Sequence, residues 1–141
     1  MLKQLRSRFS RDQRGAALVE FAMIAPILAL GIVLTGDTAT LVSRYFDMRA
    51  AVSSGSQYVM LGGTEVTVAR QVATQSWTSQ AQGSTVDASK ACLCSGSTNA
   101  CNALCPDQSV PQTYYTIQAA SSFQGTLISM PLSAQQVVRV R

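Results

Sequence analysis

The sequence contains no histidine, and only 13% of its residues are charged. Without histidine, the chain lacks the side chain that most often acts as a general base or metal ligand near neutral pH. The few acidic residues after position 15 are scattered along the chain, and neither a glycine-rich phosphate loop nor a G-x-S-x-G sequence is present. We therefore predict that the protein is not an enzyme, with no catalytic residues, no cofactor and no metal.

The positive charge of the chain is confined to its start. Residues 1–15 carry five basic side chains and one acidic one, which is a net charge of +4 and equals that of the whole chain. The remaining residues carry six basic and six acidic side chains. Because no basic face remains after residue 15, the high isoelectric point does not indicate nucleic-acid binding, and we expect no nucleic-acid partner.

A long apolar run follows the basic start and predicts a membrane anchor. Residues 16–34 make 19 positions, and a helix that spans a bilayer needs about 20. Basic residues before a first apolar segment keep that flank in the cytoplasm. We therefore expect one membrane pass, with the later residues outside the cytoplasm. A cleavable secretory signal is the competing interpretation, but such signals have a shorter apolar core without an acid such as Glu20.

Glu20 stands out because it lies inside this apolar run. A carboxylate at the centre of a bilayer helix costs about 2.5 kcal/mol or more, and less near the helix end, so an acid there calls for a partner. Basic residues end at Arg14, and then come Gly15, the small residue Ala16, three further apolar positions, Glu20 and Phe21. This order of residues resembles that of a type IV prepilin.

The resemblance implies a cleavage site and an assembly contact. A membrane-embedded prepilin peptidase would cut between Gly15 and Ala16, and Glu20 would pair with the new α-amine of a neighbouring subunit. Two charges that are each costly in hydrocarbon can offset one another when they pack together. Gly15 suits a peptidase that must approach the backbone closely. The alternative is that Gly15 and Glu20 are incidental residues at the edge of a signal anchor.

Further residues resemble the TadE/TadG-like pseudopilins of tight-adherence (Tad) pili. These are Pro26, the polar Asp37 soon after the apolar run, the Ala/Ser-rich stretch 49–55, and the stretch from Phe123 to Pro131. Major Tad pilins usually carry Tyr where this chain has Phe21, and they are shorter. The resemblance implies a minor pilus subunit involved in assembly and surface adherence. Its implied partners are the prepilin peptidase, other pilin subunits and the inner-membrane assembly machinery.

The apolar run predicts the first part of one very long helix over residues 16–61. After the membrane segment, apolar residues recur at helical spacing at Leu41, Tyr45, Met48, Val52 and Tyr58/Val59. Gly62 and Gly63 predict its end. Thr64 is expected to cap a second, short helix that ends near residues 77–82, and Trp77 is expected in the core.

The rest of the chain predicts a small sheet. Residues 84–111 are polar and are expected to form a loop, whereas residues 114–119 and 135–141 are expected to form strands. Residues 123–128 predict either another strand or a loop that returns through Gly125, and Pro131 and Ser133 predict a turn. The fold class is therefore α+β: a long N-terminal helix that is transmembrane and then amphipathic, a short second helix, and two or three antiparallel strands with a disulfide-rich loop.

Four segments follow from these patterns together with the resemblance. Residues 1–15 form a basic leader, residues 16–34 span the inner membrane, residues 35–61 extend the helix into the periplasm, and residues 62–141 form a small periplasmic domain. Two functions remain open from the sequence. One is a processed Tad-type pseudopilin that can enter an extracellular pilus. The other is an uncleaved single-pass envelope protein whose disulfide-stiffened domain binds another envelope component.

All four cysteines lie close together, at Cys92, Cys94, Cys101 and Cys105. Outside the cytoplasm an even set of cysteines predicts disulfides. A Cys92–Cys94 bridge would close a strained ring, which leaves Cys92–Cys101 with Cys94–Cys105, or Cys92–Cys105 with Cys94–Cys101. A four-cysteine zinc site is the rival, but Cys-Leu-Cys is closer than the usual ligand pair.

Overall fold

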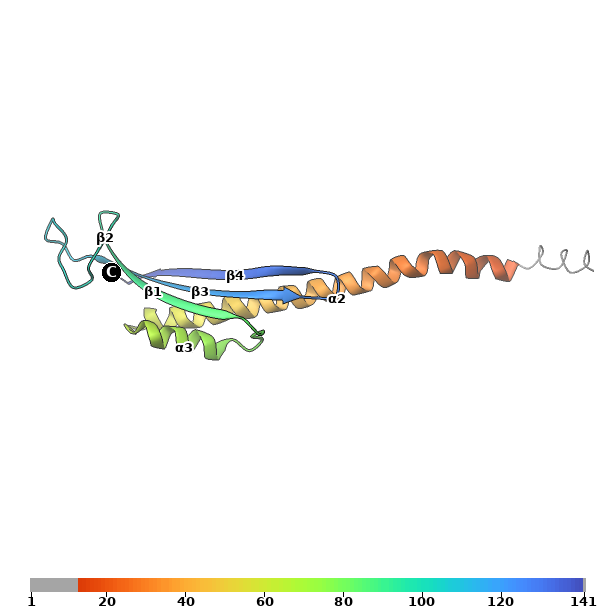
Figure 1. The fold of residues 1–141 in the computed structure, drawn as a ribbon, viewed down its shortest axis with the longest axis horizontal. Coiled ribbons are helices and arrows are strands. Elements are labelled where there is room, and N and C mark those ends of the chain that lie inside the picture. The colour runs from red at the N-terminus through yellow and green to blue at the C-terminus, as the bar shows by residue number, and fades with distance from the viewer. Residues whose placement is uncertain (1–12, 141) are drawn as a thin grey trace, which may run out of the picture.

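The computed structural model describes residues 13–140, and it shows a long helix with a small α+β domain along its second half (Figure 1). In chain order the elements are α2 (Gln13–Met60), α3 (Val66–Ser76), β1 (Thr85–Cys94), β2 (Ser97–Asn99), β3 (Gln112–Gln124) and β4 (Ser129–Arg139). The expected fold class is confirmed.

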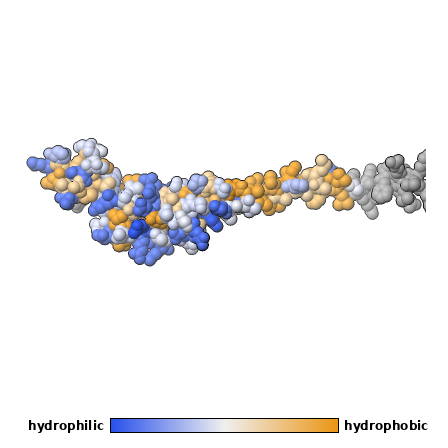
Figure 2. Space-filling view, in the orientation of Figure 1, coloured by the Kyte–Doolittle hydropathy of each residue, from blue (hydrophilic) through white to orange (hydrophobic). Residues whose placement is uncertain are grey.

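Helix α2 has 48 residues, which corresponds to about 72 Å at 1.5 Å per residue. Its two halves have different surroundings. Side chains from Ala17 to Gly36 are exposed, except for the half-buried Ala25. From Asp37 onward, one face of the same helix is buried under the domain. Figure 2 shows this change, with apolar surface along the first half of α2 and mostly polar surface over the domain.

The end of α2 is set by Gly62 and Gly63, as the sequence predicts. The amide of Gly63 donates to the carbonyl of Tyr58 at 3.0 Å, and the amide of Gly62 donates to that of Val59 at 3.1 Å. Gly62 has a φ of +97°. This pair of hydrogen bonds and the left-handed glycine form a Schellman motif, which satisfies carbonyls that the helix end leaves free. The chain can then turn back sharply into α3.

Helix α3 packs closely on α2 because Gly55 has no side chain. A Cβ atom at Gly55 would lie 2.9 Å from the carbonyl oxygen of Ala69 and 3.1 Å from the Cβ of Ala73. Thr64 is not the cap of α3, which corrects the sequence prediction. The N-cap residue is Glu65, without a side-chain hydrogen bond, and the carbonyl of Thr64 instead accepts a hydrogen bond from the Tyr115 hydroxyl at 3.1 Å.

The sheet is antiparallel and has the strand order β2-β1-β3-β4. Strand β3 lies between β1 and β4, with Thr85 opposite Ala120 and Gln124 opposite Ser129. Side chains from α2, α3 and one face of the sheet form the core. Its large buried members include Met48, Val59, Trp77, Tyr115, Ile117 and Phe123. Trp77 therefore lies in the core, as expected.

Two predictions about the sheet are wrong. Much of the expected loop 84–111 is strand, because β1 pairs with β3 over nine residues from Thr85 to Leu93. The expected turn at Pro131 and Ser133 lies within β4, where Pro131 is opposite Ser122. Strand β4 is at the edge of the sheet, and an edge strand tolerates proline because one side needs no ladder donors. The described sheet thus has four strands rather than two or three.

The cysteines form two disulfides, Cys92–Cys101 and Cys94–Cys105. This is one of the two pairings that the sequence leaves open. No cysteine is free in the described chain, so the structure does not support the zinc interpretation. Both bridges connect the last residues of β1 to the loop that follows β2. Because each closes a short loop, each is expected to contribute at the low end of about 2–4 kcal/mol.

The pairing can be tested by peptide mapping of the denatured, unreduced protein. Cleavage after Leu93 and Leu104 separates Cys92 from Cys94 and Cys101 from Cys105. The observed pairing predicts one species in which three peptides are linked in a chain through the middle peptide, 94–104. The other pairing would instead give an internally bridged middle peptide and a separate linked pair, and mass spectrometry distinguishes these outcomes. Reduction before digestion is the control and should release three separate peptides.

Candidate assembly surface

The predicted cleavage site lies near the start of the described part of α2. Residues 1–12 of the leader lie outside the described residues, whereas Gly15 and Ala16 are helical. Gly15 is exposed, and a Cβ atom added there would meet nothing within 4 Å. Glycine is about 1 kcal/mol less favourable than alanine inside a helix. Gly15 is therefore accessible, and it makes this turn easier to unwind than its neighbours.

Glu20 and Phe21 are exposed on the first half of α2. Phe21 retains 64% of its accessible surface, and Glu20 is also exposed. Ile24 and Ile27 follow Glu20 at spacings of four and seven, which places the three side chains on one face of the helix. Glu20 is thus an acid within an apolar helical surface that the protein's own domain does not cover.

This surface suits a membrane or a packed group of helices. The first half of α2 has the length and apolar composition of a helix that crosses a bilayer, and none of its most apolar stretch is buried inside the protein. A helix that is apolar all round is found buried in a large core or in a membrane. The long apolar helix therefore indicates a membrane anchor, and the two disulfides fit an oxidising compartment such as the periplasm.

Asp37 marks the point where the domain begins to cover α2, and it ties the helix to the sheet. Its side chain accepts three backbone hydrogen bonds from the loop between β3 and β4. The amide of Thr126 donates to Oδ1 at 3.0 Å, and the amides of Leu127 and Ile128 donate to Oδ2 at 2.7 and 3.2 Å. Only 7% of Asp37 remains exposed. Charge-assisted hydrogen bonds of this kind are stronger than neutral ones, so this contact holds the hairpin against the helix.

Gly125 makes room for the carboxylate. A Cβ atom at Gly125 would lie 2.8 Å from both Cγ and Oδ2 of Asp37, and 2.8 Å from the ring of Phe123. The amide of Gly125 donates to the carbonyl of Ile128 at 2.8 Å and closes the hairpin loop. Phe123 is fully buried, and the guanidinium of Arg44 lies 5.6 Å from its ring centroid. Helix and hairpin therefore fit together through one glycine and one aspartate.

The three amide donors also set the ionisation of Asp37. The hydrogen bond from Leu127 has the largest effect, followed by that from Thr126, and together with the smaller contribution of Ile128 they lower the pKa of Asp37 below its ordinary value of 3.8. Partial burial acts in the opposite direction and raises the pKa, but it is outweighed. Hydrogen bonds to the charged form favour that form, so the carboxylate is ionised at neutral pH.

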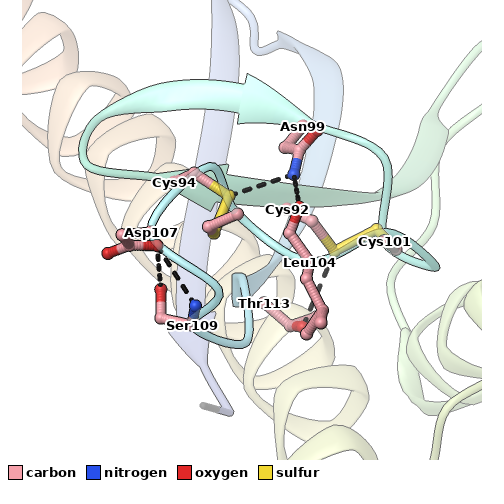
Figure 3. The surroundings of a disulfide bond; sticks show 9 residues. Cys92, Cys94, Asn99, Cys101, Leu104, Asp107, Ser109 and Thr113 are labelled. Atoms are coloured by element: carbon pink, nitrogen blue, oxygen red, sulfur yellow. Dashed lines mark hydrogen bonds between the residues drawn. A yellow bond between two sulfur atoms is a disulfide. The ribbon is translucent and has the colours of Figure 1, made fainter.

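The disulfide-linked loop lies at the other end of the domain (Figure 1). In Figure 3, the amide nitrogen of Asn99 points toward Cys94 Sγ at 3.1 Å, and the hydroxyl of Ser109 donates to Asp107 at 2.7 Å. The Ser109 hydroxyl and amide lower the pKa of Asp107 below its ordinary value. Two bridges and these local hydrogen bonds order a segment that contributes few apolar side chains to the core.

The structure places the predicted site residues in two separate regions. Gly15, Ala16, Glu20 and Phe21 lie close together on the first half of α2, and the four cysteines lie together in the two bridges. The contact between Asp37 and the loop at Gly125 was not predicted. Its only local signal is a polar residue just after an apolar run, and its partners are 89 to 91 positions away in the sequence.

Among the described residues, no group of three or more Cys, Asp or Glu side chains is arranged to hold a metal ion. Searches against protein-family models, curated proteins and solved structures found no match to this chain.

The Asp37 contact predicts acid-sensitive docking of the hairpin. Because the pKa of Asp37 is lowered in the folded state, the unfolded chain binds more protons on acidification. The contact should therefore contribute its full stability above the ordinary pKa of 3.8 and should weaken as the pH falls through the lowered pKa of the folded state. Hydrogen exchange at the amides of Thr126, Leu127 and Ile128 measures this directly. We expect their protection to fall in acid in the wild-type protein.

Two variants separate the Asp37 contact from other acid effects. Asp37→Asn should lower the protection of these amides already at neutral pH and should remove most of the further loss in acid. Asp107→Asn is the matched control, because it changes an acid with the same direction of pKa shift at the far end of the domain, and it should leave the three amides unchanged. Equal exchange in Asp37→Asn and wild type would contradict the role assigned to Asp37.

Proposed function

We propose that the protein is a minor pilin-like subunit of a Tad-type pilus. In this proposal, prepilin peptidase removes residues 1–15, and the processed chain takes part in pilus assembly and surface adherence. The observation that carries the proposal is the exposed carboxylate of Glu20 on the uncovered apolar half of α2. An anchor alone does not need this acid, whereas a subunit that pairs it with a neighbour's amine does.

The energetics favour such a pair. In hydrocarbon, both a carboxylate and an α-ammonium group are costly when isolated. Cleavage after Gly15 would create an amine at Ala16, four residues before Glu20. In the same helix the two groups are one turn apart, and between helices that are shifted along their axes the amine of one chain can reach Glu20 of another. Pairing between subunits would therefore offset both costs and fix the axial shift between neighbours.

The shape of the chain supports the same use. Helix α2 continues from the apolar half into the domain without a break at Pro26. The domain is attached along the second half of the helix, through the core and through Asp37. The first half is thus free on all sides to pack against other helices, while the domain stays beside its own helix. A helix with an uncovered apolar half is suited to the centre of a filament.

Processing predicts a new N-terminus and depends on Gly15. Intact-mass measurement or N-terminal sequencing of the protein, produced together with the prepilin peptidase, should find Ala16 as the first residue. Gly15→Ala should leave the leader in place, because the added Cβ hinders close approach of the peptidase to the backbone. Gly31→Ala is the matched control, since Gly31 is also exposed on α2 with open space around it, and it should be processed normally.

The processing experiment can also overturn the proposal. A wild-type protein that keeps its Met1 start while it functions fully would show that the leader is not removed. The protein would then be a tethered envelope module, in which the domain binds another envelope component. Normal removal of the leader from Gly15→Ala would contradict the specific role of this glycine.

The charge pair predicts that Glu20 is needed for assembly but not for processing. Glu20→Gln should be cleaved normally, and its incorporation into pili should fall more than tenfold, because loss of one partner from a buried ion pair costs about 3–5 kcal/mol. The measurements are the first residue of the membrane-bound pool and the amount of subunit in sheared pili. Glu20→Asp keeps the charge on a shorter side chain and should retain more assembly than Glu20→Gln. Normal pili from Glu20→Gln would remove the charge-pair mechanism.

A further inference from the structure

The loop between β3 and β4 is the part of the domain that lies nearest the exposed half of α2. Figure 1 shows the two strands turning at the end of the sheet that faces this half of the helix. The loop comprises residues 125–128. Three of its amides donate to the Asp37 carboxylate, so its position along the helix axis is set by Asp37.

The height of this loop above the membrane segment follows from helix geometry. The apolar run ends at Leu34, and Asp37 lies three residues later, which is about 4.5 Å further along the axis at 1.5 Å per residue. A bilayer has a hydrocarbon core of about 30 Å and a total thickness of about 40–45 Å, so each headgroup layer is roughly 5–7 Å thick. When residues 16–34 fill the hydrocarbon, Asp37 and the loop lie within the headgroup layer.

The side chains of the loop suit this position. Leu127 uses its amide to bind Asp37, yet its side chain remains 52% exposed. Met130, just beyond the loop, is 44% exposed. No charged residue occurs between Asp107 and Arg139, so the loop can enter the interface without desolvating a charged side chain of its own. The carboxylate of Asp37 is already satisfied by three amides, which removes most of the cost of placing it near lipid.

We propose that the β3–β4 loop rests on the lipid surface, with Leu127 inserted at the boundary between headgroups and acyl chains. The loop then forms a second membrane contact beside the spanning part of α2. A helix alone leaves the attached domain free to rotate and tilt over the surface. A second contact beside the helix restricts the tilt and selects the side of the domain that faces the bilayer. The proposal rests on the membrane anchor and not on the pilus function, so either can fail without the other.

The test is lipid-specific quenching of a single tryptophan in the full-length protein. Leu127→Trp is prepared in a Trp77→Phe background and reconstituted in phosphatidylcholine vesicles whose acyl chains carry bromine near the ester group. Trp77 is suited to replacement because its Nε1 has no hydrogen-bond partner among the described residues. We expect the fluorescence intensity of Leu127→Trp to be severalfold lower in brominated vesicles than in unbrominated ones.

The matched control is Val110→Trp in the same background. Val110 is 64% exposed and lies after the disulfide-linked loop, away from the anchor, so its fluorescence should be the same in both kinds of vesicle. If position 127 is quenched no more than position 110, the loop stands in water or against another protein, and the proposal is wrong. Should Trp77→Phe not fold, Leu127→Trp is compared with the unmodified chain, in which the buried Trp77 supplies a constant signal, and the same difference decides the result.

Discussion

Helix α2 supplies both the anchor and the foundation of the domain, although its backbone is one continuous helix. In hydrocarbon, a helix satisfies its own backbone hydrogen bonds, so the first half needs no protein around it. The second half has a stripe of apolar residues and Gly55, and these let α3 and the sheet pack on one face. Asp37 lies between the exposed half of α2 and the half that the domain covers, and its hydrogen bonds to the hairpin define where the domain begins.

Much of the architecture could be predicted because it depends on local signals. The helix over residues 16–61, its end at Gly62 and the burial of Trp77 follow from periodicity and from glycine, and the structure confirms them. Strand β1 was missed because most of its residues are small, polar or charged, as in Ala88, Ser89 and Lys90, and few of them are strand formers. Pro131 was misread as a turn because its tolerance depends on β4 being an edge strand, and a single sequence does not reveal which strand takes the edge.

The candidate site also has one part that local sequence signals predict and another part that they do not. The sequence alone singles out Gly15, Glu20 and Phe21 as candidate site residues, because they form a short pattern between a basic start and an apolar run. The disulfide pairing and the contact between Asp37 and the loop at Gly125 depend on where distant segments meet. Spacing alone leaves two cysteine pairings open, and only the path of β1 and the loop after β2 selects Cys92–Cys101. Tertiary packing decides such contacts, and local propensity carries little information about them.

The orientation of the strands has a mechanical consequence. Strands β3 and β4 run alongside α2, and the disulfide-linked loop stands at the end of the sheet away from the anchor (Figure 1). A force that pulls this loop away from the anchor is therefore directed along the strands. It loads the ladder hydrogen bonds together in shear, whereas a force across the strands would open them one after another. Cys92–Cys101 and Cys94–Cys105 also limit how far the loop can extend, so tension passes into the sheet before the loop unravels.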